Sequence, residues 1–127
     1  MSRTPSPRPV PPAAVPSVHL EEVNGTATPF DVLPLADAMN VHGPCVFVVC
    51  HFVYKQGVVV PVNLYLSHTT HLARTLADPQ LQACLTRHGA THVRVLHEAL
   101  SARRKAGVAA LRALRGPCNE QLSQPSR

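Results

Sequence analysis

The sequence GPCVFVVCHFVYKQGVVVPVNLYL, residues 43–66, contains two apolar, valine-rich runs separated by Gln56-Gly57. Valine and aromatic residues favour extended strands, and glycine accepts the positive φ angle of a two-residue hairpin turn. The turn sets an antiparallel register with the pairs Lys55–Val58, Val53–Val60, His51–Val62 and Val49–Leu64. Neither face of this hairpin is polar, so its first strand needs a cover on both sides. Pro61 cannot donate to a strand ladder, which favours an edge or bulged position for the second strand.

The sequence before the hairpin predicts one short strand and one short helical segment. The side chains of residues 18–23 follow an alternating pattern that ends at Asn24-Gly25, which is typical of a strand followed by a turn. Residues 29–40 predict one or two helical turns, interrupted near Pro34.

The sequence after the hairpin predicts two helices and one strand. Asp78-Pro79 is a helix start signal, and Gly89 fits the position after the helix end. Residues 90–96 alternate as a strand does, although the start of the last helix is an alternative. Residues 98–115 predict that last helix, which Gly116-Pro117 ends.

This order of elements predicts an α+β fold. We expect a small mixed sheet built on the hairpin of residues 45–66, with helices packed on one face. The expected division is a disordered proline-rich arm over residues 1–17, a single domain over residues 18–116 and a flexible tail over residues 117–127.

Charge and cysteine content limit the class of protein. The chain has 127 residues, a formal net charge of +5 and four cysteines. Cys45 and Cys50 would point to opposite faces of one strand, so they cannot form a disulfide with each other. With no signal peptide evident, we expect reduced thiols in an intracellular compartment, the cytoplasm or nucleus, with the mitochondrion as an alternative. The apolar run before Lys55 is too short for a membrane span.

No catalytic residue and no cofactor is predicted. The six glycines form no phosphate-binding loop, and the seven acidic residues are dispersed along the chain, which gives no support to paired-carboxylate chemistry. Cys50 and His51 are neighbours on a strand and point in opposite directions, so they cannot act as a nucleophile and its base. We therefore expect a protein that is not an enzyme.

Two binding sites remain as alternatives. A basic cluster near the C-terminus could contact the phosphates of RNA, with Arg104, Arg112 and Arg115 on one face of the last helix. Its members are Arg103, Arg104, Lys105, Arg112 and Arg115. Among the eight histidines and four cysteines, two pairs with helical spacing could form a small metal site. These residues are His68, His71, Cys84 and His88.

The leading functional hypothesis is a non-catalytic adaptor or small subunit of a larger protein assembly. It would contact other subunits, or a second copy of itself, through a sheet edge and a hydrophobic face. The edges expected to be open lie near Pro61 and along residues 18–23.

Overall fold

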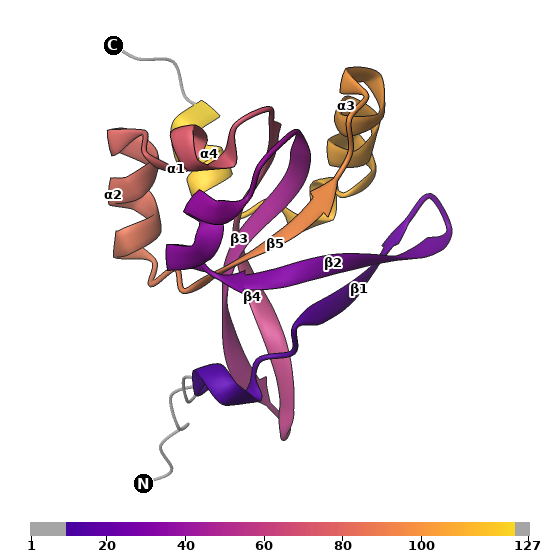
Figure 1. Cartoon of the computed structure of the whole chain (residues 1–127). Coiled ribbons are helices and arrows are strands. Elements are labelled where there is room, and N and C mark those ends of the chain that lie inside the picture. Colours follow the sequence, from indigo (N-terminus) through magenta and orange to yellow (C-terminus); the bar gives the residue numbers. More distant parts are fainter. Residues whose placement is uncertain (1–9, 124–127) are drawn as a thin grey trace, which may run out of the picture.

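The computed structural model of the chain describes residues 10–123, and its centre is a curled antiparallel sheet (Figure 1). The strands lie in the order β1-β2-β5-β3-β4. Their bounds are β1 (Val18–Val23), β2 (Thr26–Pro34), β3 (Cys45–Lys55), β4 (Val58–Thr69) and β5 (His92–His97). The α+β class is confirmed, and every strand pair is antiparallel, so the sheet is not the mixed one expected.

The central hairpin forms as predicted up to its middle. Gln56 and Gly57 have φ angles of 53° and 77°, as a primed turn requires. The three pairs nearest the turn are confirmed, but Val49 lies opposite Tyr65 instead of Leu64 because a bulge interrupts the ladder between Val49 and Cys50. The bulge brings Tyr65 to the same face as Phe47, with ring centroids 5.9 Å apart.

The N-terminal hairpin is only partly as expected. The strand over residues 18–23 is confirmed, and Asn24-Gly25 turns it with φ angles of 51° and 80°. The expected helical turns over residues 29–40 are wrong for the first half, because β2 continues to Pro34 and only η2 (Leu35–Asn40) is helical. Phe30 and Val32 alternate inward along β2 and pack in the core, which gives this segment its strand character.

One face of the sheet carries the larger core. Three helices cover it: α1 (Leu72–Leu76), α2 (Pro79–Arg87) and α4 (Pro117–Ser123). Asp78 caps α2 as predicted, because its carboxylate accepts a hydrogen bond of 3.0 Å from the Leu81 amide. The strand expected over residues 90–96 is present as β5, at the centre of the sheet.

The opposite face packs against α3 (Ser101–Ala110) and η3 (Arg112–Leu114). Helices therefore lie against both faces instead of one. The helix expected over residues 98–115 is shorter, because it ends at Ala110 and the chain continues as a 3-10 turn. This break places Leu111 in the core formed with Phe30, Val46 and Leu66, and the partly buried Leu114 packs against it.

Both ends of the expected domain extend further than predicted. The flexible tail expected from residue 117 is wrong over residues 117–123, which form α4 and are linked to α2 by a disulfide between Cys84 and Cys118. At the other end, η1 (Pro12–Ala14) forms. Val10 and Val15 pack against the buried cluster of Val32, Cys50 and Phe52. Residues 1–9 of the expected arm lie outside the described residues.

Candidate functional site

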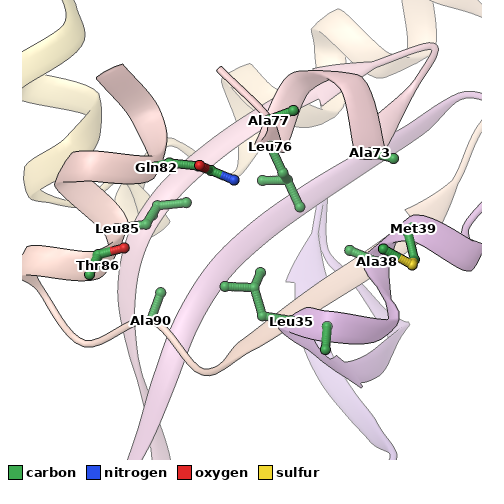
Figure 2. A pocket seen from close by; sticks show the side chains of 11 residues that line it. Leu35, Ala38, Met39, Ala73, Leu76, Ala77, Gln82, Leu85, Thr86 and Ala90 are labelled. Atoms are coloured by element: carbon green, nitrogen blue, oxygen red, sulfur yellow. The ribbon is translucent and has the colours of Figure 1, made fainter. Parts of the chain in front are cut away.

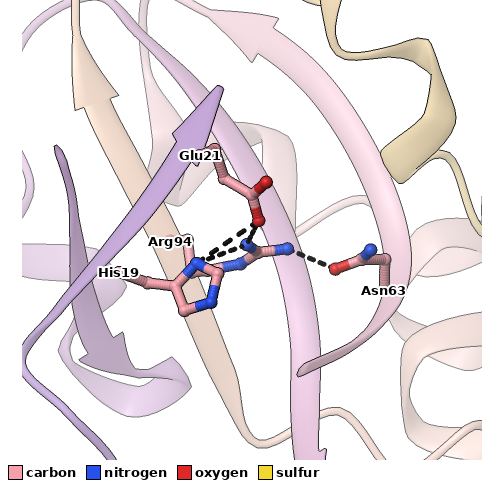
Figure 3. Close-up of polar contacts among 4 residues, drawn as sticks. All are labelled: His19, Glu21, Asn63 and Arg94. Atoms are coloured by element: carbon pink, nitrogen blue, oxygen red, sulfur yellow. Dashed lines mark hydrogen bonds and ion pairs between the residues drawn. The ribbon is translucent and has the colours of Figure 1, made fainter. Parts of the chain in front are cut away.

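Arg94 of β5 lies completely buried inside the curl of the sheet (Figure 3). Its guanidinium donates to the carboxylate of Glu21 on β1 and to the amide oxygen of Asn63 on β4. It also contacts Nδ1 of His19 at 3.2 Å. β1 and β4 are the two edges of the sheet, each two strands away from β5. In a flat sheet each edge would be about 10 Å from the central strand, so one side chain can join both only because the sheet curls.

The surroundings of Arg94 set the protonation of its neighbours. Burial, and then the positive charge of Arg94, lower the pKa of His19, while Glu21 acts in the opposite direction. A neutral His19 can accept the Arg94 hydrogen bond through Nδ1. Burial raises the pKa of the Cys50 thiol to about 11, although Arg94 acts against it. Cys50 is therefore protonated at neutral pH and is a poor nucleophile.

The edge of β4 is covered by a segment of the chain itself. The Asn119 side chain accepts a 2.8 Å hydrogen bond from the Leu66 amide and donates one of 2.8 Å to the Leu66 carbonyl. Gly116 lies so close that a β-carbon there would be 2.3 Å from the Asn63 carbonyl oxygen. The side chain of Asn119 thus takes the place of a neighbouring strand at Leu66.

The edge of β1 has no comparable cover among residues 10–123. Val18 is 47% exposed and Leu20 is 62% exposed. Asn24-Gly25 forms a primed two-residue turn, and the Ser17 carbonyl accepts a hydrogen bond from the Val32 amide. Backbone groups alternate in direction along a strand, so the odd-numbered residues of β1 bond to β2. The amides and carbonyls of Val18, Leu20 and Glu22 therefore point out of the sheet.

An apolar groove lies between η2, α1 and α2 (Figure 2). Its volume is about 450 Å³, and no charged side chain is among the residues that line it. Leu35, Leu76 and Leu85 form its inner wall, and Met39 stands at the rim with 69% of its surface exposed. The groove can hold an apolar side chain, but helices form it, and it is not the face of the hairpin from which the sequence predicted a hydrophobic contact.

The five residues of the predicted basic cluster do not share one exposed helix face. Arg104 is buried, and its guanidinium donates to the carbonyls of Glu98 and Ala99 at 3.0 and 2.8 Å. Because α3 ends at Ala110, Arg112 and Arg115 do not share a helix face with Arg104. Arg103 lies 3.8 Å from the Glu98 carboxylate.

The predicted metal residues separate into two groups. Cys84 lies on α2, His88 is the C-cap residue of that helix, and Cys118 joins them: their ligand atoms are all within 4.8 Å of one another. His68 lies instead on β4, where burial, and then the charges of Arg104 and Lys105, lower its pKa. His71 precedes α1 and is exposed.

The cysteines do not all match the expectation of reduced thiols. Cys84 and Cys118 form a disulfide with Cα atoms 5.9 Å apart, whereas Cys45 and Cys50 are free and buried. Sequence parity tests only a pair on one strand and does not address a bridge between two helices. A disulfide gives no support to the reducing compartment that we expected.

Comparisons with known proteins do not identify the chain. It matches no protein family, no curated protein and no solved structure. Within residues 10–123, no helix has the length and apolar character that a membrane crossing needs.

The residues that sequence reasoning missed are those around Arg94. The signal was present: Arg94 interrupts a valine-rich run, and it shares a face with Leu96. A cation in the middle of a buried strand requires an anionic or carbonyl partner. Its partners, Glu21 and Asn63, lie 73 and 31 residues away in the chain, so spacing could not identify them.

Proposed function

We propose that the protein is a non-catalytic subunit that assembles by adding a strand to the open edge of β1. The observation that supports this is the difference between the two edges: the chain covers β4 at Leu66 with Asn119, while Leu20 of β1 is 62% exposed. Exposed edges with outward apolar residues pair readily with another strand, and proteins usually protect them.

The partner that β1 fits is a second copy of this chain. An antiparallel pairing with Leu20 opposite Leu20 of the other copy uses the outward backbone groups of both strands. The same register places Val18 opposite Glu22, and on the inner face it places His19 opposite Glu21. None of these pairs places two charges of the same sign opposite each other. Two sheets would then join into one continuous sheet around a two-fold axis at Leu20.

The oligomeric state tests this proposal. We expect sedimentation velocity over a range of protein concentrations to show a monomer–dimer equilibrium. Leu20→Lys places a charge on the edge and should raise the dissociation constant at least about tenfold, equal to about 1.4 kcal/mol. Val58→Lys is the matched control, because Val58 is 60% exposed but lies at the tip of the β3–β4 hairpin. A monomer at every concentration, or equal effects of the two variants, would contradict the proposal.

A second candidate function is contact with RNA, which the exposed cations near α3 favour. Lys105, Arg112 and Arg115 are exposed, and the described residues place no carboxylate within salt-bridge distance of them. Arg104 is no longer part of this set because its guanidinium is committed to carbonyl groups. Retention on an RNA column at about 50 mM salt, lost in a Lys105→Gln/Arg112→Gln variant, would support RNA contact. Equal retention of the variant would exclude this surface.

A further inference from the structure

Two helices bring three metal-ligating side chains together at a place far from the β1 edge. Cys84 lies in the last turn of α2, and His88 is the C-cap residue of that helix, where its amide donates a 3.1 Å hydrogen bond to the Cys84 carbonyl. The two residues are four apart, so their side chains lie on the same side of the helix end. Cys118 is the second residue of α4 and lies against them. Both cysteines are buried and His88 is half-buried, and the three ligand atoms lie within 4.8 Å of one another.

An oxygen donor completes the arrangement. Oε1 of Gln121 lies 3.2 Å from Sγ of Cys84, and it also accepts a 3.1 Å hydrogen bond from the exposed Arg87. Gln121 follows Cys118 by three residues, so both can face α2 from the same side of α4. Two sulfurs and one imidazole nitrogen therefore lie close together, and an amide oxygen lies next to one of the sulfurs.

We propose that this cluster binds a zinc-class divalent metal ion when the disulfide is reduced. Cys84 and Cys118 would supply two thiolates and His88 one imidazole nitrogen, with Gln121 or a water in the fourth position. Zn²⁺ takes this kind of tetrahedral set of sulfur and nitrogen ligands, and soft thiolates favour it over Mg²⁺ or Ca²⁺.

The chemistry of the exchange balances with a dithiol as reductant. The dithiol gives two electrons and two protons to the Cys84–Cys118 bond, which breaks into two thiols, and it becomes a disulfide itself. When the metal ion binds, both thiols lose their protons to solvent. An oxidised dithiol reverses the steps: its disulfide accepts the two electrons and, with two protons from solvent, becomes a dithiol, the Cys84–Cys118 bond forms again and the ion is released.

The consequence for the fold is that two different bonds can hold the same helix. α4 contains Asn119, whose side chain covers the β4 edge at Leu66. The disulfide holds α4 against α2 in the oxidised chain, and the metal ion holds it in the reduced chain. The metal site therefore goes beyond strand pairing at β1 and does not depend on it.

Titration with Co²⁺ tests the proposal, because thiolate ligands give Co²⁺ a charge-transfer absorption in the near ultraviolet. After reduction with a dithiol and removal of the reductant, the full chain should bind one Co²⁺ per chain with this absorption, and Zn²⁺ should displace it. The oxidised chain should show no such band. Reduced protein without a thiolate band would overturn the proposal.

Three variants separate this site from other ligands. His88→Gln should weaken Co²⁺ binding at least about tenfold, which is the cost of losing even an outer-shell partner. The matched control His71→Gln should leave binding unchanged. Cys118→Ser should lose most of the charge-transfer band; if it keeps the full band, Cys118 is not a ligand and the proposal fails. Equal binding by His88→Gln and the unchanged protein would also overturn it.

Circular dichroism keeps the test decisive if reduction loosens the fold. Co²⁺ or Zn²⁺ should raise the thermal midpoint of the reduced chain and leave that of the oxidised chain unchanged. A reduced chain that is unfolded, and that neither metal ion refolds, would contradict the proposal.

Discussion

Replacing Arg94 with methionine should lower the free energy of unfolding by about 3 kcal/mol, toward the low end of the cost of breaking a buried ion pair. The Arg94 side chain is fully buried, and that of Glu21 is 19% exposed. Glu21 can therefore recover part of its hydration, and methionine keeps the packing of the arginine stem. What is lost is the charge and three hydrogen bonds, of which those to Glu21 and His19 join β1 to β5 and the one to Asn63 joins β4 to β5.

Urea unfolding followed by circular dichroism measures this change. If the denaturant slope is about 2 kcal/mol/M, the midpoint should fall by roughly 1.5 M. Arg103→Met is the matched control, since the Arg103 side chain is 73% exposed, and it should change stability by less than about 0.5 kcal/mol. In the double-mutant cycle with Glu21→Gln, the two changes should couple by about 2 kcal/mol. A loss below about 1 kcal/mol for Arg94→Met, at the level of an average substitution, would refute the role of Arg94 as the link between the edges.

Three further predictions concern the same sheet. Gly116→Ala should destabilise the fold by about 1–3 kcal/mol through overpacking, because the new β-carbon would lie 2.3 Å from the Asn63 carbonyl oxygen. Gly107→Ala makes only an ordinary 3.5 Å contact and should stabilise the fold by about 0.5–1 kcal/mol. Thermal melts that rank the two variants the other way would contradict this packing. Asn119→Ala should lower the free energy of unfolding, measured by urea denaturation, by about 2–3 kcal/mol, because it leaves two buried backbone groups of Leu66 without partners. A loss below about 0.5 kcal/mol would show that α4 does not depend on this contact. The fold lowers the pKa of His19, so below its unfolded value of about 6.5 the unfolded chain binds the proton more readily and stability falls as the pH falls. Asparagine in His19→Asn keeps an acceptor in that position and does not titrate. The free energy of unfolding of this variant should therefore fall less between about pH 7.5 and 5.5 than that of the unchanged protein. If the free energy of unfolding of both proteins has the same slope with pH, His19 is not responsible.

The sequence predicted the elements that local patterns determine. The hairpin turn at Gln56-Gly57, the strand before Asn24-Gly25 and the cap at Asp78 each depend on residues within a few positions of one another. Those signals act through turn and capping geometry, which short stretches of sequence carry directly.

The features that were missed depend on contacts between distant segments. The Cys84–Cys118 disulfide spans 34 residues, and Arg94 reaches Glu21 across 73 residues. The bulge opposite Val49 shifted the register because tertiary packing overrode the strict alternation. In the same way, the proline at each end of residues 29–34 hides the alternation of this strand, so the sequence predicts helical turns there.

The candidate site was only partly visible in the sequence. Residues 18–23 were expected to be an open edge, and the structure places β1 at the edge of the sheet. Pro61 marked the other edge, but the cover that Asn119 gives at Leu66 depends on α4, which was expected to be a loose tail.

Amide hydrogen exchange along β1, measured at low and high protein concentration, tests the proposed strand pairing most directly. The account predicts that His19 and Glu21, which bond to β2, are protected at both concentrations, while Leu20 and Glu22 become protected only at high concentration. If the Leu20 amide exchanges at the same rate at every concentration, a second copy does not pair along β1 and the account is contradicted.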